Sequence, residues 1–213
     1  LSATIPNCIS YDPTYAYELA VIVQDGLHRM VAEQQDVFYY LTVMNENYEH
    51  PAMPEGAAPD ILKGMYLFRK GAANNGPRVQ LLGSGTIFRE AIAAAELLRA
   101  DWGVEADLWS CPSFTELARD GHDCTRHHLL RPDAPPRVCH VTACLGDTRG
   151  PVVAATDYLR AFAEQIRPFV AAGGRRYVVL GTDGFGRSDT REQLRHFFEV
   201  DRYWITLASL RAL

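Results

Sequence analysis

The chain has 213 residues, of which 47% are hydrophobic and 22% charged, and its formal net charge is −5. This composition is typical of a globular protein, and because no stripe of lysine and arginine occurs, nucleic acid is not expected as the main partner. No apolar run approaches the roughly 20 residues that span a bilayer, so no membrane partner is predicted, and no signal peptide is recognisable.

The cysteines argue against a disulfide scaffold or a zinc knuckle. Their number is odd and no C-x-x-C pair occurs, so scattered free thiols and a cytoplasmic location are expected. The five cysteines are Cys8, Cys111, Cys124, Cys139 and Cys144.

The beginning of the chain indicates a small α/β unit that ends in a linker. Residues 5–10 predict a buried strand, and Asp12 is the predicted N-cap of the amphipathic helix that follows. Residues 36–44 are aromatic and β-branched and predict a second buried strand. The segment 45–60 contains three prolines and few aliphatic residues. We therefore predict a linker there and a domain boundary near residue 62.

The rest of the chain alternates between strand and helix patterns. In chain order, the predicted elements are a strand at 78–85, a helix at 86–101, a strand at 103–111, a broken helix at 113–130, strands at 137–144 and 151–156, a helix at 157–170, a strand at 176–183, a helix at 189–198 and a last helix after Asp201. Asp157 is a predicted N-cap. This alternation predicts an α/β fold, a three-layer sandwich whose mostly parallel sheet is covered by helices on both faces.

Both ends of the sequence interrupt a pattern. The chain opens on a leucine and closes on "YWITLASLRAL", an apolar-periodic run without a helix stop signal. We therefore expect a piece of a longer protein.

The stretch "GTDGFGRSDT", residues 181–190, imitates the spacing of a phosphate loop between a strand and a helix. A phosphate loop has a lysine where this chain has Arg187, and it normally follows the first strand of its domain, whereas this strand is the last. The favoured interpretation is a tight turn in which Ser188 or Asp189 caps the next helix. A degenerate nucleotide site is the alternative.

Three further clusters have weaker patterns. "LLGSG" at 81–85 could receive an anion at a helix N-terminus, but close strand–helix packing explains its glycines equally well. "DGHDCTRHH" places Cys124 and His128 on one helix face, where a solvated face is expected rather than a zinc site. In "VCHVTAC", Cys139 and His140 would lie on opposite faces of a strand, which works against shared ligation.

The segment "NENYEHP" directly follows a predicted strand. Ligands of open parallel sheets collect beyond the carboxyl ends of strands, and Glu46, Glu49 and His50 could perform acid–base chemistry there. A solvated entrance to the linker explains the same residues, and position alone leaves both interpretations open.

Several segments, taken in order, resemble one family. "IPNCISYDPTYAYELAVIVQDGLHRM", "YYLTVMNENYEHPAMPEG", "LLGSG", "SFTELARDGHDC" and "LGTDGFGRSDTREQLRHFFEVD" are similar to the carboxy-terminal part of the bacterial homodimeric pyruvate dehydrogenases. These are the thiamine-diphosphate-dependent first components of the pyruvate dehydrogenase complex. The similarity runs over nearly the whole chain, and the layout is more remotely similar to transketolase.

The resemblance implies two domains. Residues 1–62 would be the tail of the middle, pyrimidine-binding domain with its linker, and residues 63–213 would be the transketolase C-terminal-like domain, which supports the homodimer. Asn45 and Glu46 would lie near the active-site funnel, and no catalytic, cofactor-binding or metal-binding residue is expected in this segment. The residues of a structural turn would be Gly181, Asp183, Gly184, Gly186 and Ser188.

By this resemblance, the intact protein would decarboxylate pyruvate on thiamine diphosphate and magnesium and reductively acetylate the lipoyl group of the acyltransferase. Upstream regions would bind the cofactor, so this chain alone would be inactive. "NENYEH" stands where transketolases have an arginine for the substrate phosphate, and the lack of one there suits a small keto acid. The alternatives are a non-catalytic interaction module and, less favoured, a degenerate phosphate-loop nucleotide-binding protein.

Overall fold

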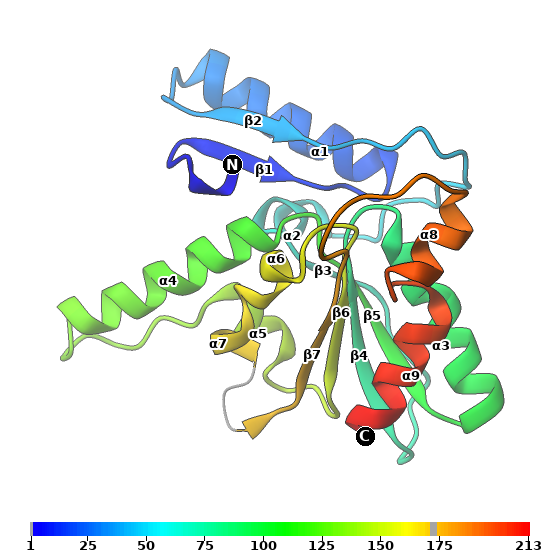
Figure 1. Cartoon of the computed structure of the whole chain (residues 1–213). Helices are drawn as coiled ribbons and strands as arrows, with labels where there is room; N and C mark the ends of the chain where they lie inside the picture. The colour runs from blue at the N-terminus through cyan, green and yellow to red at the C-terminus, as the bar shows by residue number, and fades with distance from the viewer. Residues whose placement is uncertain (1, 171–173) are drawn as a thin grey trace.

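A five-stranded, mostly parallel sheet lies at the centre of the fold, in the order β3-β5-β4-β6-β7. The computed structural model describes residues 2–170 and 174–213 (Figure 1). The strands are β3 (Tyr66–Arg69), β4 (Arg78–Gly83), β5 (Glu105–Ser110), β6 (Val152–Ala155) and β7 (Tyr177–Leu180). All pairs are parallel except β3 with β5. The four predicted strands that correspond to β4, β5, β6 and β7 are confirmed, somewhat shortened, whereas β3 has no counterpart among the predictions.

Helices cover both faces of this sheet, as Figure 1 shows. One face carries α3 (Ile87–Trp102) and α9 (Arg202–Ala212), and the other carries α4 (Phe114–Leu130), α5 (His140–Leu145), α6 (Arg160–Glu164) and α7 (Arg167–Val170). Side chains of a strand alternate between the two faces of the sheet. Leu81 and Val153 therefore belong to the core under α3 and α9, whereas Leu82 and Val152 belong to the core under α4 to α7. The predicted three-layer α/β sandwich is confirmed.

The residues before the sheet form a smaller α/β unit. Its elements are a 3₁₀ turn (Ser2–Thr4), β1 (Cys8–Tyr11), α1 (Ala16–Leu27), a π-helical turn (His28–Ala32) and β2 (Phe38–Leu41), which pairs parallel to β1. α2 (Ala58–Lys63) follows. Ile9 and Ile22 of this unit share a core with Ile61 of α2 and Tyr66 of β3. The two parts of the chain are therefore packed together.

The second strand of the small unit is correctly predicted as a strand but wrongly predicted as buried. Phe38 is 44% exposed and Tyr40 is 51% exposed. β2 has one strand partner, β1. Among the described residues no further layer covers the outer face of β2, so its apolar side chains remain in contact with solvent.

The prediction of a strand at 137–144 is wrong. The chain is helical from His140 to Leu145, because Val141 and Leu145, four residues apart, are both buried in the core that α4 also joins. The backbone N–H of His140 donates to Asp120 Oδ2 at 2.6 Å, which fixes the start of this helix. Cys139 and His140 therefore do not lie on opposite faces of a strand.

The helix at 113–130 is continuous rather than broken. Ser113 caps it and accepts a 3.1 Å hydrogen bond from Glu116 N. Gly121 in its middle faces the ring of Phe169, and an added Cβ would lie 2.2 Å from that ring. The glycine thus allows close packing and does not interrupt the helix.

Three predicted caps are wrong. α1 has Tyr15 at its N-cap instead of Asp12, because Glu18 accepts the free N–H groups of Thr14 and Tyr15. The predicted helix at 157–170 is two short helices, α6 and α7, and Leu159 stands at the N-cap of α6 in place of Asp157. For α8 (Arg191–Phe197), the cap is Thr190, which accepts from Gln193 N at 3.3 Å, and neither Ser188 nor Asp189. α9 begins after Asp201, as predicted.

Candidate functional site

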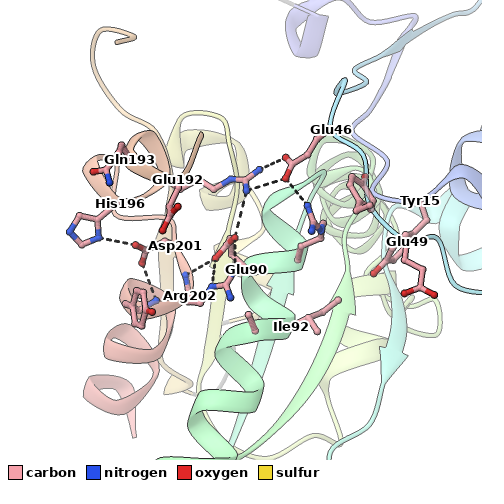
Figure 2. A pocket seen from close by; sticks show the side chains of 15 residues that line it. Tyr15, Glu46, Glu49, Glu90, Ile92, Glu192, Gln193, His196, Asp201 and Arg202 are labelled. Atoms are coloured by element: carbon pink, nitrogen blue, oxygen red, sulfur yellow. Dashed lines mark hydrogen bonds and ion pairs between the residues drawn. The ribbon is translucent and has the colours of Figure 1, made fainter. Parts of the chain in front are cut away.

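A cleft of about 830 Å³ opens where the small unit meets the large sheet domain. Its walls come from Tyr15 at the start of α1, the segment 46–49, the first turns of α3, and residues of α8 and α9 (Figure 2). The floor contains Ile92, and the walls are mostly charged. Of the two residues expected near a funnel, Glu46 lines this cleft.

Glu46 is held by two arginines from different helices. Its carboxylate accepts from Arg89 Nη1 of α3 and from Arg195 Nη2 of α8, each at 2.6 Å. Arg191 Nε lies 4.0 Å away. Burial by itself would raise the pKa of Glu46, but the hydrogen bonds and charges of Arg195 and Arg89 outweigh it and hold that pKa below its usual value. Glu46 is therefore an ionised anchor at neutral pH.

A second carboxylate, Glu90 of α3, continues this network. It accepts from Arg202 Nε at 2.9 Å and from Arg202 N at 3.1 Å, and Arg195 Nη1 lies 3.6 Å from it. Figure 2 shows Glu46 and Glu90 joined by dashed lines that meet at the guanidinium group between them. Arg195 thus bridges two carboxylates, and the three arginines of the cleft wall each have a carboxylate partner.

The neighbours of Glu46 in the segment 45–50 are also anchored. Asn45 accepts a hydrogen bond from Arg191 of α8, and neither of these two residues lines the cleft. The hydroxyl of Tyr48 donates to Thr14 O, and its ring stacks on His50 at 4.8 Å between centroids. His50 Nδ1 accepts from Ala16 N at 3.0 Å. This segment is fixed to α1 on one side and to α8 on the other.

Sequence reasoning missed the arginines of this cleft. Arg89 and Arg195 lie far from the segment 45–50 in the sequence, and a pattern within one segment does not predict such partners. One signal is present: Arg191 and Arg195 are four residues apart and share one face of α8.

A second, smaller cavity of about 60 Å³ lies at the carboxyl ends of β4 and β6. Ser84 and Thr156 meet there at 3.0 Å, and Thr42 donates to Asp12 Oδ1 at 2.8 Å. Asp12 Oδ2 is buried without a hydrogen-bond partner in the described structure. The Asp12 carboxylate stands 2.6 Å from where a Cβ of Gly85 would lie, so an anion at the "LLGSG" turn would meet a carboxylate.

The loop 181–190 makes contacts that do not resemble a phosphate cradle. Asp183 accepts from Arg160 N at 3.0 Å and from Arg160 Nε at 2.5 Å, which places a carboxylate in the loop. Arg187 lies over the ring of Phe197 at 4.1 Å. Gly184 has φ +92°, a left-handed conformation that favours glycine.

No metal site is formed by the side chains of residues 2–170 and 174–213, since no three His, Cys, Asp or Glu groups gather there. Cys124 Sγ points to Asp120 Oδ1 at 3.9 Å, whereas His128 Nε2 accepts from Arg137 N at 2.8 Å. In the same part of the chain, every helix is too short or too polar to cross a membrane.

Two family models match the chain. Residues 64–201 match the transketolase-like TK C-terminal domain. The chain belongs to this family. Residues 1–51 match the middle domain of the pyruvate dehydrogenase E1 component.

The curated relatives have one name in common, "Pyruvate dehydrogenase E1 component". The protein from Cupriavidus necator is 74% identical over 99% of this chain, that from Pseudomonas aeruginosa 59% identical over 100%, and that from Escherichia coli K12 55% identical over 100%. The chain spans only 23 to 24% of the length of these relatives. The resemblance expected from the motifs is confirmed.

Solved structures show the same fold. The transketolase from Campylobacter jejuni aligns over 99% of this chain and 27% of its own length, with a TM-score of 0.65 and 17% identity. A split-gene transketolase described as an inactive beta4 tetramer aligns over 100% of this chain and 59% of its own, with a TM-score of 0.59 and 17% identity. At this identity the likeness concerns the fold alone.

Proposed function

We propose that this chain is the carboxy-terminal part of a pyruvate dehydrogenase E1 component. The observation that carries the proposal is 74% identity over almost the whole chain to a protein of that name, of which the chain spans 23%. In the intact protein, pyruvate would be decarboxylated on thiamine diphosphate with magnesium, and the two-carbon unit would pass to the lipoyl group of the acyltransferase. We further propose that the intact enzyme is a cytoplasmic homodimer.

The domain boundary proposed from the sequence lies near residue 62. Residues 1–62 would complete a middle domain whose remaining strands lie elsewhere in the intact protein, which is supported by the exposed outer face of β2. Residues 63–213 would form the C-terminal domain. The thiamine diphosphate would be bound mainly outside this chain.

We propose that the cleft forms one wall of the active-site funnel. Its position beyond the carboxyl end of β2, at the junction of two α/β units, is where ligands of such folds collect. Asn45 and Glu46 would stand at this wall as structural anchors, and the residues 181–190 would act as a turn that carries α8 to it. These residues would position the wall of the cleft, and the chemistry would belong to the rest of the enzyme.

The proposal is tested on the full-length polypeptide that contains this chain. We expect pyruvate-dependent reduction of ferricyanide that requires thiamine diphosphate and magnesium, and NADH formation when the acyltransferase and the lipoamide reductase are added. The isolated 213-residue chain should show neither activity. Full-length protein that turns over another 2-oxo acid but not pyruvate would overturn the substrate assignment.

Calorimetry of the isolated chain gives a second test. Titration with magnesium–thiamine diphosphate and, in parallel, with magnesium–ATP should give no saturable heat. Saturable binding of ATP would support a nucleotide site at 181–190, and binding of thiamine diphosphate would show that the chain itself contains cofactor contacts.

A further inference from the structure

Two arginines on one face of α8 form hydrogen bonds with two consecutive residues of the segment 45–50. Arg191 donates to the side-chain oxygen of Asn45, and Arg195, one turn later, donates to Glu46 at 2.6 Å. Residues four apart on an α-helix lie on the same face. The spacing of the two arginines therefore allows both of them to bind adjacent residues of one extended segment.

The segment depends on such side-chain contacts for its position. Residues 42–57 form neither helix nor strand, so no backbone ladder fixes them. On the side away from α8, Tyr48 and His50 are tied to the start of α1. The segment is thus held between the start of α1 and α8, and these side-chain contacts determine its conformation.

Arg195 is the better buried of the two arginines on Glu46. Its side chain is 12% exposed, that of Glu46 is 16% exposed, and that of Arg89 is 35% exposed. Removal of Arg195 would leave Glu46 and Glu90 facing each other with less counter-charge in a partly desolvated place. Glu90 lies within α3, whereas Glu46 lies on an irregular segment. Repulsion between the two carboxylates would therefore move Glu46 and its segment rather than Glu90.

We propose that Arg195 is a positioning residue for substrate entry. It fixes Glu46, and through Glu46 the segment 45–50, on the wall of the cleft in the conformation that admits the keto acid. This inference rests on the proposed function, because it takes the cleft as part of the route to the active site. The loop "GTDGFGRSDT" then has a structural role, because it connects the edge strand β7 to α8 and so places α8 beside the segment 45–50 (Figure 1).

The test uses the full-length enzyme and four variants: Arg195→Ala, Arg195→Lys, Glu46→Gln and the double variant Arg195→Ala/Glu46→Gln. Arg99→Ala is the matched control, since Arg99 lies on α3 in an exposed pair with Glu96 and does not line the cleft. Initial rates of ferricyanide reduction at varied pyruvate give kcat and KM separately. Hydrogen exchange of peptides that cover residues 45–57 is measured on the same samples.

For Arg195→Ala we expect the KM for pyruvate to rise by about tenfold while kcat changes by less than about threefold, because binding geometry rather than chemistry is lost. Arg195→Lys should recover part of the KM, and the double variant should be no worse than Arg195→Ala, since the two residues act as one pair. Exchange in residues 45–57 should become faster in Arg195→Ala and remain unchanged in Arg99→Ala.

Two results would overturn the inference. One is a KM in Arg195→Ala equal to that of Arg99→Ala. The other is unchanged exchange of residues 45–57 in Arg195→Ala, and this readout needs no turnover. If the unaltered full-length enzyme does not turn over pyruvate, the proposed function fails, and the exchange experiment still decides whether Arg195 positions the segment.

Discussion

Glu18 and Ser110 are 92 residues apart in the sequence, and the Ser110 hydroxyl donates to Glu18 Oε1 at 2.6 Å. Glu18 belongs to α1 of the small unit and Ser110 ends β5 of the large sheet. The same carboxylate accepts from Tyr66 of β3 at 2.6 Å and from two backbone N–H groups at the start of α1. A fully buried carboxylate therefore joins the two parts of the chain.

Replacement of Glu18 by alanine should strongly destabilise the isolated chain. The substitution leaves the donors of Ser110 and of two backbone amides without their acceptor in a buried site, while Tyr66 keeps only the Tyr17 hydroxyl as a partner, and we expect a loss of about 3–5 kcal/mol in the free energy of unfolding. Urea unfolding followed by circular dichroism measures it. The control is the exposed Glu55→Ala, and a loss for Glu18→Ala no larger than for Glu55→Ala would contradict the role of this carboxylate.

Much of the fold of the large domain was predictable because most of its strands and helices leave a local pattern. Continuous apolar runs such as those of β4 and β6 are typical of strands buried on both faces, and the alternation with helices predicts the parallel sheet. The error at 137–144 has a physical cause: Val141 and Leu145 fit a helix as well as a short strand, and packing against α4 decides between them. β3 escapes prediction since a four-residue edge strand leaves little pattern.

The candidate site was predictable only in part. Polar residues after β2 indicate a place where ligands collect, and Glu46 does line the cleft. The partners of Glu46 come from α3 and α8, and their approach depends on how the two units pack together. A single sequence contains no local signal for that packing, which is also why the role of Glu18 is invisible before the structure.

The stability of the chain should depend on pH through Asp12. Burial raises the pKa of Asp12 to about 6 from its ordinary value of 3.8, against the hydrogen bond from Thr42 that lowers it. A carboxyl whose pKa is higher in the folded chain than in the unfolded chain stabilises the fold below the lower value, and this stabilisation is lost as pH rises through the higher one. The resulting cost at neutral pH is roughly 2–3 kcal/mol.

The substitution Asp12→Asn isolates this effect. The amide cannot ionise, so the difference in unfolding free energy between Asp12→Asn and the unaltered chain should grow in favour of the variant between pH 4 and pH 7. Urea unfolding at each pH unit measures the difference. Stability curves that run parallel over this window would show that Asp12 keeps an ordinary pKa in the fold.

At Gly184 there is room for a side chain, but the backbone conformation disfavours any residue other than glycine. Nothing lies within 4 Å of an added Cβ, yet φ is +92°. Gly184→Val should therefore lower the free energy of unfolding by about 1–2 kcal/mol through backbone strain alone. Gly186→Val is the matched control, because Gly186 has the same open surroundings and no left-handed φ. Equal melting temperatures for the two variants would remove the argument from φ.

The small unit should be the least protected part of the isolated chain. β2 has a strand partner on one side, and Phe38, Tyr40, Val43 and Val31 expose apolar surface that further strands of a middle domain would cover. In hydrogen exchange, we expect residues 28–44 to exchange faster in the isolated chain than in the full-length protein, while β4 and β5 exchange slowly in both. Strong protection of residues 28–44 in a monomeric sample of the isolated chain would show that this unit is complete without further strands.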